Sequence, residues 1–190
     1  MPTWRVKYTN ISAKDFLKSD YYIKCTELLN NDNLISYLKE HEMKLVFYPH
    51  IEMQKFINLF QTKSDLIEIK SANTDIVEDL LIESKVLITD YSSVFFDFSY
   101  LEKKVIFFHF DNDENDNAVN KRWFSFEKDS IGPIFYDVNT MVRYIDEFGV
   151  DSIENCFKQK MQEFFPEKKC NNCENTFIEA INLLEHYNGK

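Results

Sequence analysis

Asp90, Ser92 and Ser93 form a polar cluster where an apolar run meets a helical pattern. The apolar run, residues 86–88, is too short for a helix and predicts a buried strand, whereas apolar residues in 94–101 recur at helical spacing. Serine and aspartate side chains bond the unpaired backbone N–H groups at a helix start, and those groups also attract anions. The cluster therefore predicts a phosphate site, with an ordinary capped turn as the alternative.

Two further sets of polar residues also follow predicted strands. His50 follows the run 44–48 after Pro49, and His109 and Asp111 lie at the end of the run 105–110. In open parallel sheets, ligands bind beyond the carboxyl ends of the strands. We therefore expect all three sets to converge on one crevice.

Helical and strand patterns alternate along the whole chain and predict an α/β fold. The predicted strands are 44–48, 66–69, 86–89, 105–110 and 134–136. The predicted helices are 16–29, 34–38, 53–60, 76–81, 94–101, 140–148, 152–165 and 174–186. This order predicts a single Rossmann-like domain over 1–190, in which a parallel sheet has helices on both faces and the C-terminal helices of about 151–187 pack at its edge.

Composition narrows the possible ligands. Apolar residues make up 44% of the chain, enough for a core, while the net charge of −10 opposes binding to nucleic acid or anionic lipid. The three glycines cannot form a dinucleotide-binding fingerprint or a Walker loop, so a nicotinamide, flavin or ATP-loop site is not expected. No apolar run is long enough to span a membrane and no secretory signal precedes the domain, which predicts a cytoplasmic location.

Metal binding is not expected either. Cys170 and Cys173 form half of a zinc motif without further ligands of suitable spacing, and we expect Cys173 to face inward at the start of the final helix. The acidic run 111–116 lacks the glycine and terminal glutamate of a calcium loop and predicts a solvated loop.

An ordered set of motifs resembles the CDP-glycerol glycerophosphotransferase family, the teichoic-acid polymerases and primases. The sharpest motif is Asp90-Tyr-Ser-Ser93 with Phe96-Asp97, and further matches run in the family's order. They are Pro2-Thr-Trp-Arg5, Leu45-Val-Phe-Tyr-Pro-His50, Val105-Ile-Phe-Phe-His-Phe-Asp111, Trp123-Phe-Ser-Phe126, Gly132-Pro133 and Asn171-Asn-Cys-Glu174.

The resemblance implies the C-terminal, donor-binding domain of a GT-B transferase, without the N-terminal acceptor domain. The implied reaction transfers glycerol phosphate from CDP-glycerol to a hydroxyl of a teichoic-acid-like or capsular polymer, or of a lipid-linked primer, and releases CMP. No cofactor beyond this substrate is implied. The resemblance also implies a general base in a separate N-terminal domain or subunit, and acceptors carried at the inner face of the bacterial membrane.

Three residues are expected to contact the donor most directly. His50 can donate to a pyrophosphate oxygen and, if protonated, neutralise charge on the departing nucleotide; its alternative role is a helix cap. Ser93 is the preferred phosphate ligand, and Ser92 is either a second ligand or a cap. Asp97 lies one helical turn beyond Ser93 and would bind the glycerol or ribose hydroxyls, because a carboxylate repels phosphate.

The remaining candidates have open alternatives. Arg5 is either a phosphate ligand or a surface cation, and Asp90 is either a ligand or structural. Asp111 at a strand end would meet the nucleotide, whereas His109 is either a core residue or the internal base of a single-domain enzyme. For the whole chain, the alternatives are a transferase for CDP-ribitol or another polyol phosphate, and a non-catalytic nucleotide-binding or interaction module completed by a partner chain.

Overall fold

Parallel strand pairing defines the fold, as the alternating sequence pattern predicted. The computed structural model describes residues 2–111, 124–165 and 172–188. Within these residues, β1 (Leu45–Phe47) pairs with β2 (Ile67–Ile69), and β4 (Lys104–Phe108) pairs with β3 (Val86–Thr89) and β5 (Ile134–Phe135). The α/β class is confirmed. Hydrogen bonds divide the described strands into two sheets, β1-β2 and β3-β4-β5, and not into the expected single sheet.

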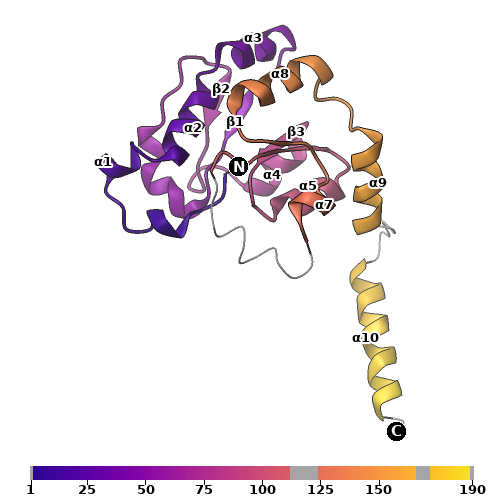
Figure 1. Cartoon of the computed structure of the whole chain (residues 1–190). Coiled ribbons are helices and arrows are strands. Elements are labelled where there is room, and N and C mark those ends of the chain that lie inside the picture. Colours follow the sequence, from indigo (N-terminus) through magenta and orange to yellow (C-terminus); the bar gives the residue numbers. More distant parts are fainter. Residues whose placement is uncertain (1, 112–123, 166–171, 189–190) are drawn as a thin grey trace.

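Helices flank both sheets (Figure 1). The 3₁₀ helices are η1 (Val6–Tyr8) and η2 (Ile51–Leu59). The described α-helices are α1 (Ala13–Phe16), α2 (Asp20–Leu29), α3 (Asp32–Glu40), α4 (Val77–Glu83), α5 (Val94–Tyr100), α7 (Phe126–Asp129), α8 (Val138–Phe148), α9 (Asn155–Phe164) and α10 (Asn172–Asn188).

The central strand, β4, is buried on both faces. Its alternate residues Ile106 and Phe108 enter a core with α2, α3, η2 and α8, whereas Val105 and Phe107 enter a second core with α5 and α9. All five residues of β4 are buried, as expected for a parallel strand with both faces covered. β4 leads to Asp111, three residues beyond its last residue Phe108, at the end of the sheet where Asp90 follows β3.

Two helical predictions differ from the structure. The predicted helix 16–29 is divided into α1 and α2, because the Ser19 side chain accepts a hydrogen bond from the N–H of Tyr22 and caps a new helix. The pattern at 53–60 forms the 3₁₀ helix η2, whose apolar side chains Met53 and Phe56 still face the core. A spacing of three residues suits both helix types, so the sequence pattern did not separate them.

The C-terminal helices behave differently from each other. α9 packs Met161 and Phe164 against the second core. α10 extends away from the rest of the chain (Figure 1), and its side chains from Cys173 to Leu184 are exposed, which differs from the expected packing at the domain edge. Cys173 is exposed, so the prediction that it faces inward is wrong. None of the described helices is both long and apolar enough to cross a membrane.

Some sequence features lie outside the described residues. These are residues 112–116 of the acidic run, Trp123 of the motif Trp123-Phe-Ser-Phe126, Cys170 of the paired cysteines, and Asn171 of the motif Asn171-Asn-Cys-Glu174. Their predicted roles stay predictions.

Candidate functional site

The Asp90-Tyr-Ser-Ser93 turn joins β3 to α5 as predicted. Ser92 Oγ accepts a hydrogen bond from the N–H of Val94 at 3.4 Å, so Ser92 provides the cap. Ser93 occupies the position before the helix, makes no side-chain capping bond and is exposed. α5 has only seven residues, so its dipole is small and the Ser93 hydroxyl is the stronger candidate for contact with an anion.

Asp97 lies one turn further along α5. Its side chain and that of Ser93 are both exposed. Residues four apart are neighbours on a helix surface. A ligand held at Ser93 would therefore have the Asp97 carboxylate beside it, where it can accept hydrogen bonds from hydroxyl groups.

His50 caps a helix through one ring nitrogen, and no hydrogen bond of the other nitrogen to a described residue is recorded. Its Nδ1 accepts a hydrogen bond from the N–H of Glu52 at 3.2 Å at the start of η2. A ring nitrogen that accepts is unprotonated, so the proton of the neutral ring is on Nε2. The two roles that the sequence left as alternatives are thus compatible, because the cap uses one nitrogen and leaves Nε2–H as a donor.

A buried ion triad joins Arg5, Asp90 and Asp111. Arg5 Nε and Nη2 donate to the two carboxylate oxygens of Asp111 at 3.0 and 2.8 Å, and Nη2 also donates to Asp90 at 2.8 Å. Arg5 and Asp90 are each 1% exposed. Such bidentate, charge-assisted bonds are strong and geometrically specific.

The triad keeps Arg5 charged. Burial alone would lower the pKa of Arg5, but the hydrogen bonds and charges of Asp111 and Asp90 outweigh it and raise that pKa above its usual value. Arg5 is therefore not the surface cation that the sequence allowed. Its bonds to two carboxylates make it a link between the ends of β3 and β4.

The chain segment Pro2 to Arg5, here called the N-terminal strap, crosses the carboxyl ends of both sheets. The N–H of His50 donates to the carbonyl of Pro2 at 3.3 Å, and the N–H of Thr3 donates to both oxygens of Asp90 at 2.8 and 2.9 Å. The Trp4 ring stacks on the His50 ring, with centroids 6.4 Å apart and planes 21° apart. The sequence analysis assigned no role to Thr3 or Trp4. The one feature of the sequence that pointed to them was their place in the motif Pro2-Thr-Trp-Arg5.

Tyr91 joins the triad to the aromatic core. Its ring contacts the guanidinium of Arg5, whose carbon lies 5.2 Å from the ring centroid, and stacks on the ring of His109, with centroids 4.1 Å apart. Its hydroxyl donates to the carbonyl of Asp111 at 3.0 Å. His109 is 4% exposed and packs among aromatic rings, which favours the core role over that of an internal base.

The structure brings some predicted residues together and leaves others apart. Arg5, Asp90 and Asp111 are in direct contact, and His50 is tied to them through the strap. Ser93 and Asp97 are close to this group in sequence, because α5 follows Asp90. The structure records no hydrogen bond between their side chains and Arg5, Asp90 or Asp111 among the described residues.

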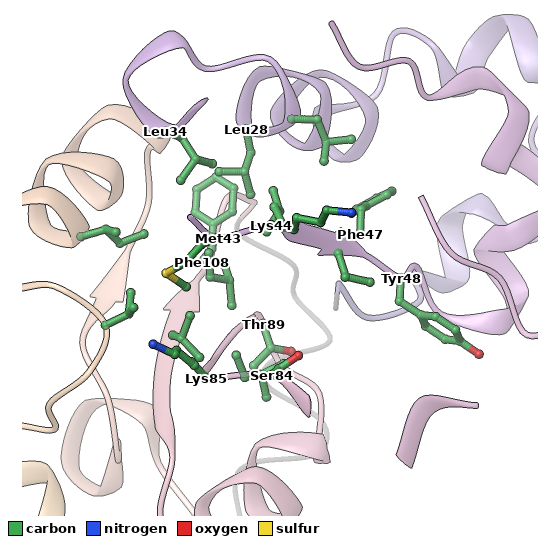
Figure 2. Close-up of a pocket in the computed structure, with 18 of the residues that line it drawn as sticks. Leu28, Leu34, Met43, Lys44, Phe47, Tyr48, Ser84, Lys85, Thr89 and Phe108 are labelled. Carbon is green, nitrogen blue, oxygen red and sulfur yellow. The ribbon is translucent and has the colours of Figure 1, made fainter. Parts of the chain in front are cut away.

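A cavity of about 380 Å³ lies between the open edges of β1 and β3 (Figure 2). Most of its lining is apolar, from α2, α3, β1 and β3, while Thr89 and Asp90 lie at the end of β3 and Pro2 belongs to the strap. His50, Ser93 and Asp97 are not among its lining residues. The cavity therefore separates the two sheets and is distinct from the exposed surface at the β3–α5 turn.

Among residues 2–111, 124–165 and 172–188, no group of three or more His, Cys, Asp or Glu side chains is arranged to hold a metal ion. Two of the candidate carboxylates, Asp90 and Asp111, bond to Arg5.

Comparison with known proteins places these features in a family. Residues 1–173 match the family described as CDP-glycerol:poly(glycerophosphate) glycerophosphotransferase. The minor teichoic acid biosynthesis protein GgaB of Bacillus subtilis (strain 168) is 28% identical over 98% of this chain and 21% of its own length. The teichoic acid poly(glycerol phosphate) polymerase of Staphylococcus epidermidis is 26% identical over 86% of this chain and 21% of its own length.

A solved structure agrees in fold. The wall teichoic acid polymerase TagF superposes with a TM-score of 0.64 at 22% identity, over 95% of this chain and 40% of that chain. A variant of TagF soaked with CDPG gives the same TM-score at 25% identity. This chain spans about a fifth of the length of these two curated relatives. With the family matched over 1–173 and its motifs at the ends of β1, β3 and β4, the chain belongs to the CDP-glycerol:poly(glycerophosphate) glycerophosphotransferase family.

Proposed function

We propose that this chain is the donor-binding part of a glycerophosphotransferase that moves glycerol phosphate from CDP-glycerol to a hydroxyl of a teichoic-acid-like or capsular polymer. The observation that carries the proposal is the set of hydrogen-bond donors at two strand ends, His50 Nε2–H after β1 and the Ser93 hydroxyl after β3, in a chain of this family. An imidazole N–H and a hydroxyl can both donate hydrogen bonds to the negatively charged oxygens of a pyrophosphate.

The proposed reaction is a displacement at the β-phosphorus of CDP-glycerol. A hydroxyl oxygen of the acceptor forms a new bond to this phosphorus, and the bond from phosphorus to the bridging pyrophosphate oxygen breaks. The electron pair of the broken bond leaves with CMP. His50 and Ser93 stabilise the negative charge that develops on the bridging and non-bridging oxygens, and the acceptor proton goes to a base supplied from outside this domain.

Asp97 is proposed to orient the donor. Its exposed carboxylate accepts hydrogen bonds from the glycerol or ribose hydroxyls of the donor. We propose that Asp90, Asp111 and Arg5 act mainly by holding the β3–α5 turn, because their polar atoms already bond to one another. The reaction needs no further cofactor in this proposal.

The proposed partners and location follow from the same reaction. The acceptor is a polymeric or lipid-linked polyol phosphate, and a separate N-terminal acceptor domain or subunit provides its site. Such a chain would work at the inner face of the bacterial membrane. CDP-ribitol is the alternative donor, because the exposed Asp97 can bond hydroxyls of either polyol.

The second candidate is a nucleotide-binding module that does not catalyse transfer by itself. It is favoured by the burial of His109 beneath Tyr91, which takes the internal base candidate away from the surface where Ser93 is exposed. Donor binding without CMP release, with and without a hydroxyl acceptor, would support this candidate.

Calorimetric titration of CDP-glycerol, CDP-ribitol and CMP into the purified chain tests the proposal. We expect saturable binding of CDP-glycerol that weakens about 10-fold or more in His50→Ala and in Ser93→Ala, because a hydrogen bond to a charged group is lost in each. His41→Ala and Ser152→Ala change the same residue types at other exposed positions and should bind as the unaltered chain does. Equal affinities in all five proteins would refute the assigned site.

A further inference from the structure

The N-terminal strap is a hydrogen-bonded connection between the two sheets. At β1, the N–H of His50 donates to the carbonyl of Pro2; at β3, the N–H and the hydroxyl of Thr3 both donate to Asp90. Between β1 and β3 the described strands share no ladder of hydrogen bonds, and the cavity occupies that space. The position of His50 relative to the β3–α5 turn therefore depends on the strap.

We propose that the strap positions His50 for the donor, with Trp4 as the residue that fixes the plane of the imidazole ring. This inference rests on the proposed function, in which His50 Nε2–H contacts the pyrophosphate. Trp4 is a positioning residue here, because it acts on the donor only through His50.

The contacts on either side of Trp4 hold it against His50. Thr3 is bonded to Asp90, and Arg5 Nη1 donates to the carbonyl of Thr3 at 3.0 Å while its other nitrogens bond to Asp90 and Asp111. The Trp4 backbone is thus tethered by a neighbour on each side. Its half-buried indole lies nearly parallel to the imidazole, at an interplanar angle of 21°.

The orientation of the ring decides its chemistry. With Nδ1 accepting from the N–H of Glu52, the neutral ring offers Nε2–H, a donor that an anion attracts. The other tautomer would lose the bond to Glu52 and present a lone pair on Nε2, which a phosphate oxygen repels. A ring that rotates freely would adopt both forms and bind the donor less well.

Nitrogen NMR of the His50 ring in the unliganded chain tests the first step. We expect the unaltered chain to show the Nε2–H tautomer, Trp4→Phe to keep it, and Trp4→Leu to show a mixture of the two. A different tautomer in the unaltered chain, or an unchanged ring in Trp4→Leu, would overturn the proposal. If Trp4→Leu does not fold, Thr3→Val takes its place in the NMR comparison. This substitution replaces the Thr3 hydroxyl, which donates to Asp90, with a methyl group and so loosens the strap while Trp4 is kept.

Calorimetry with CDP-glycerol tests the second step. We expect Trp4→Leu to weaken binding about 3- to 10-fold, the range for one side chain losing its order, and Trp4→Phe to restore most of the affinity. Phe148→Leu, which replaces an exposed aromatic side chain on α8, is the matched control.

A double-mutant cycle separates positioning from direct contact. In a His50→Ala background, Trp4→Leu should cause no further loss of affinity, because Trp4 acts through His50. An equal loss in both backgrounds would show that Trp4 contacts the donor itself and would overturn the proposal. Failure of the unaltered chain to bind CDP-glycerol would count against the proposed function, whereas the NMR comparison decides the positioning by itself.

Discussion

Thr3 and Asp90 are 87 positions apart in the sequence, yet the backbone N–H of Thr3 donates to both carboxylate oxygens of Asp90 at 2.8 and 2.9 Å. The same carboxylate accepts from Arg5, so one buried aspartate ties the start of the chain to the end of β3. Because Ser93 and Asp97 follow Asp90 in the chain, the stability of this connection and the geometry of the site are linked.

Arg5→Met should strongly destabilise the fold. The substitution leaves the carboxylates of Asp90 and Asp111 buried without their cation, and breaking such a pair costs about 3–5 kcal/mol. Urea unfolding followed by circular dichroism at neutral pH measures this change. Arg5→Lys should lose roughly 1–3 kcal/mol, because lysine keeps the charge but not the bidentate geometry. A loss below about 1 kcal/mol in Arg5→Met would contradict a structural role for the triad.

Asp97→Ala should distinguish which part of the donor this carboxylate contacts. If Asp97 bonds the glycerol, affinity for CDP-glycerol falls about 10-fold while affinity for CMP is unchanged, because CMP has no glycerol. A contact to the ribose would weaken both ligands equally. Competition of CMP against CDP-glycerol, measured calorimetrically, provides both values, and Asp151→Ala at another exposed aspartate is the control. No change for either ligand would exclude Asp97 from the site.

Gly132→Ala should disrupt the centre of the sheet. A Cβ at this position would lie 2.1 Å from the carbonyl oxygen of Val105, on a strand held by neighbours on both edges. Overpacking of this kind costs about 1–3 kcal/mol, and the fixed backbone places this site at the upper end. Thermal unfolding measures the loss.

Gly149→Ala provides the comparison for Gly132. Gly149 has a positive φ of 67°, but the nearest atom to an added Cβ is 3.9 Å away. At φ 67° and ψ −175° Gly149 occupies a backbone region that is almost restricted to glycine, so the cost is backbone strain alone, about 1–3 kcal/mol. A loss below about 1 kcal/mol in Gly132→Ala would show that β4 can move to admit the methyl group.

Asp137 should make α8 sensitive to acid. The N–H of Thr140 donates to its carboxylate at 2.9 Å and lowers the pKa of Asp137. A lowered pKa in the folded chain means that the stabilisation is present above the ordinary aspartate value of about 3.9 and is lost as the pH falls through the folded value. Asp137→Ala should therefore cost about 1 kcal/mol at pH 7 and progressively less below about pH 4.

Urea unfolding at several pH values tests this dependence. Asp137→Asn keeps a capping oxygen that does not titrate, so its stability should stay close to that of the unaltered chain at pH 7. A gap between the unaltered chain and Asp137→Ala that is as wide at pH 3 as at pH 7 would rule out the capping carboxylate as its source.

Local sequence patterns were sufficient to predict most of the helices and strands and to select the individual candidate residues. The strand at 86–89, the helix that follows and the fully buried run of β4 could be predicted because side-chain periodicity reports secondary structure directly. The family resemblance rested on ordered motifs and was confirmed by the match over 1–173. The interruption at Ser19 was missed because a serine inside a helical pattern is also compatible with a continuous helix.

The sequence by itself determined the fold class, the family and the residue types available at the strand ends. Only the tertiary structure decided how those residues combine. Arg5 lies far along the chain from both Asp90 and Asp111, and neither its burial nor its two partners can be deduced from spacing. Charged side chains become buried only where the fold supplies opposite charges at hydrogen-bonding distance, and that arrangement arises from packing between distant segments. The stacking of His50 on Trp4 has the same origin, since it depends on where the strap crosses the ends of the two sheets. The capping of η2 by His50 is local by contrast, because it joins residues two apart, and the sequence already offered it as an alternative role.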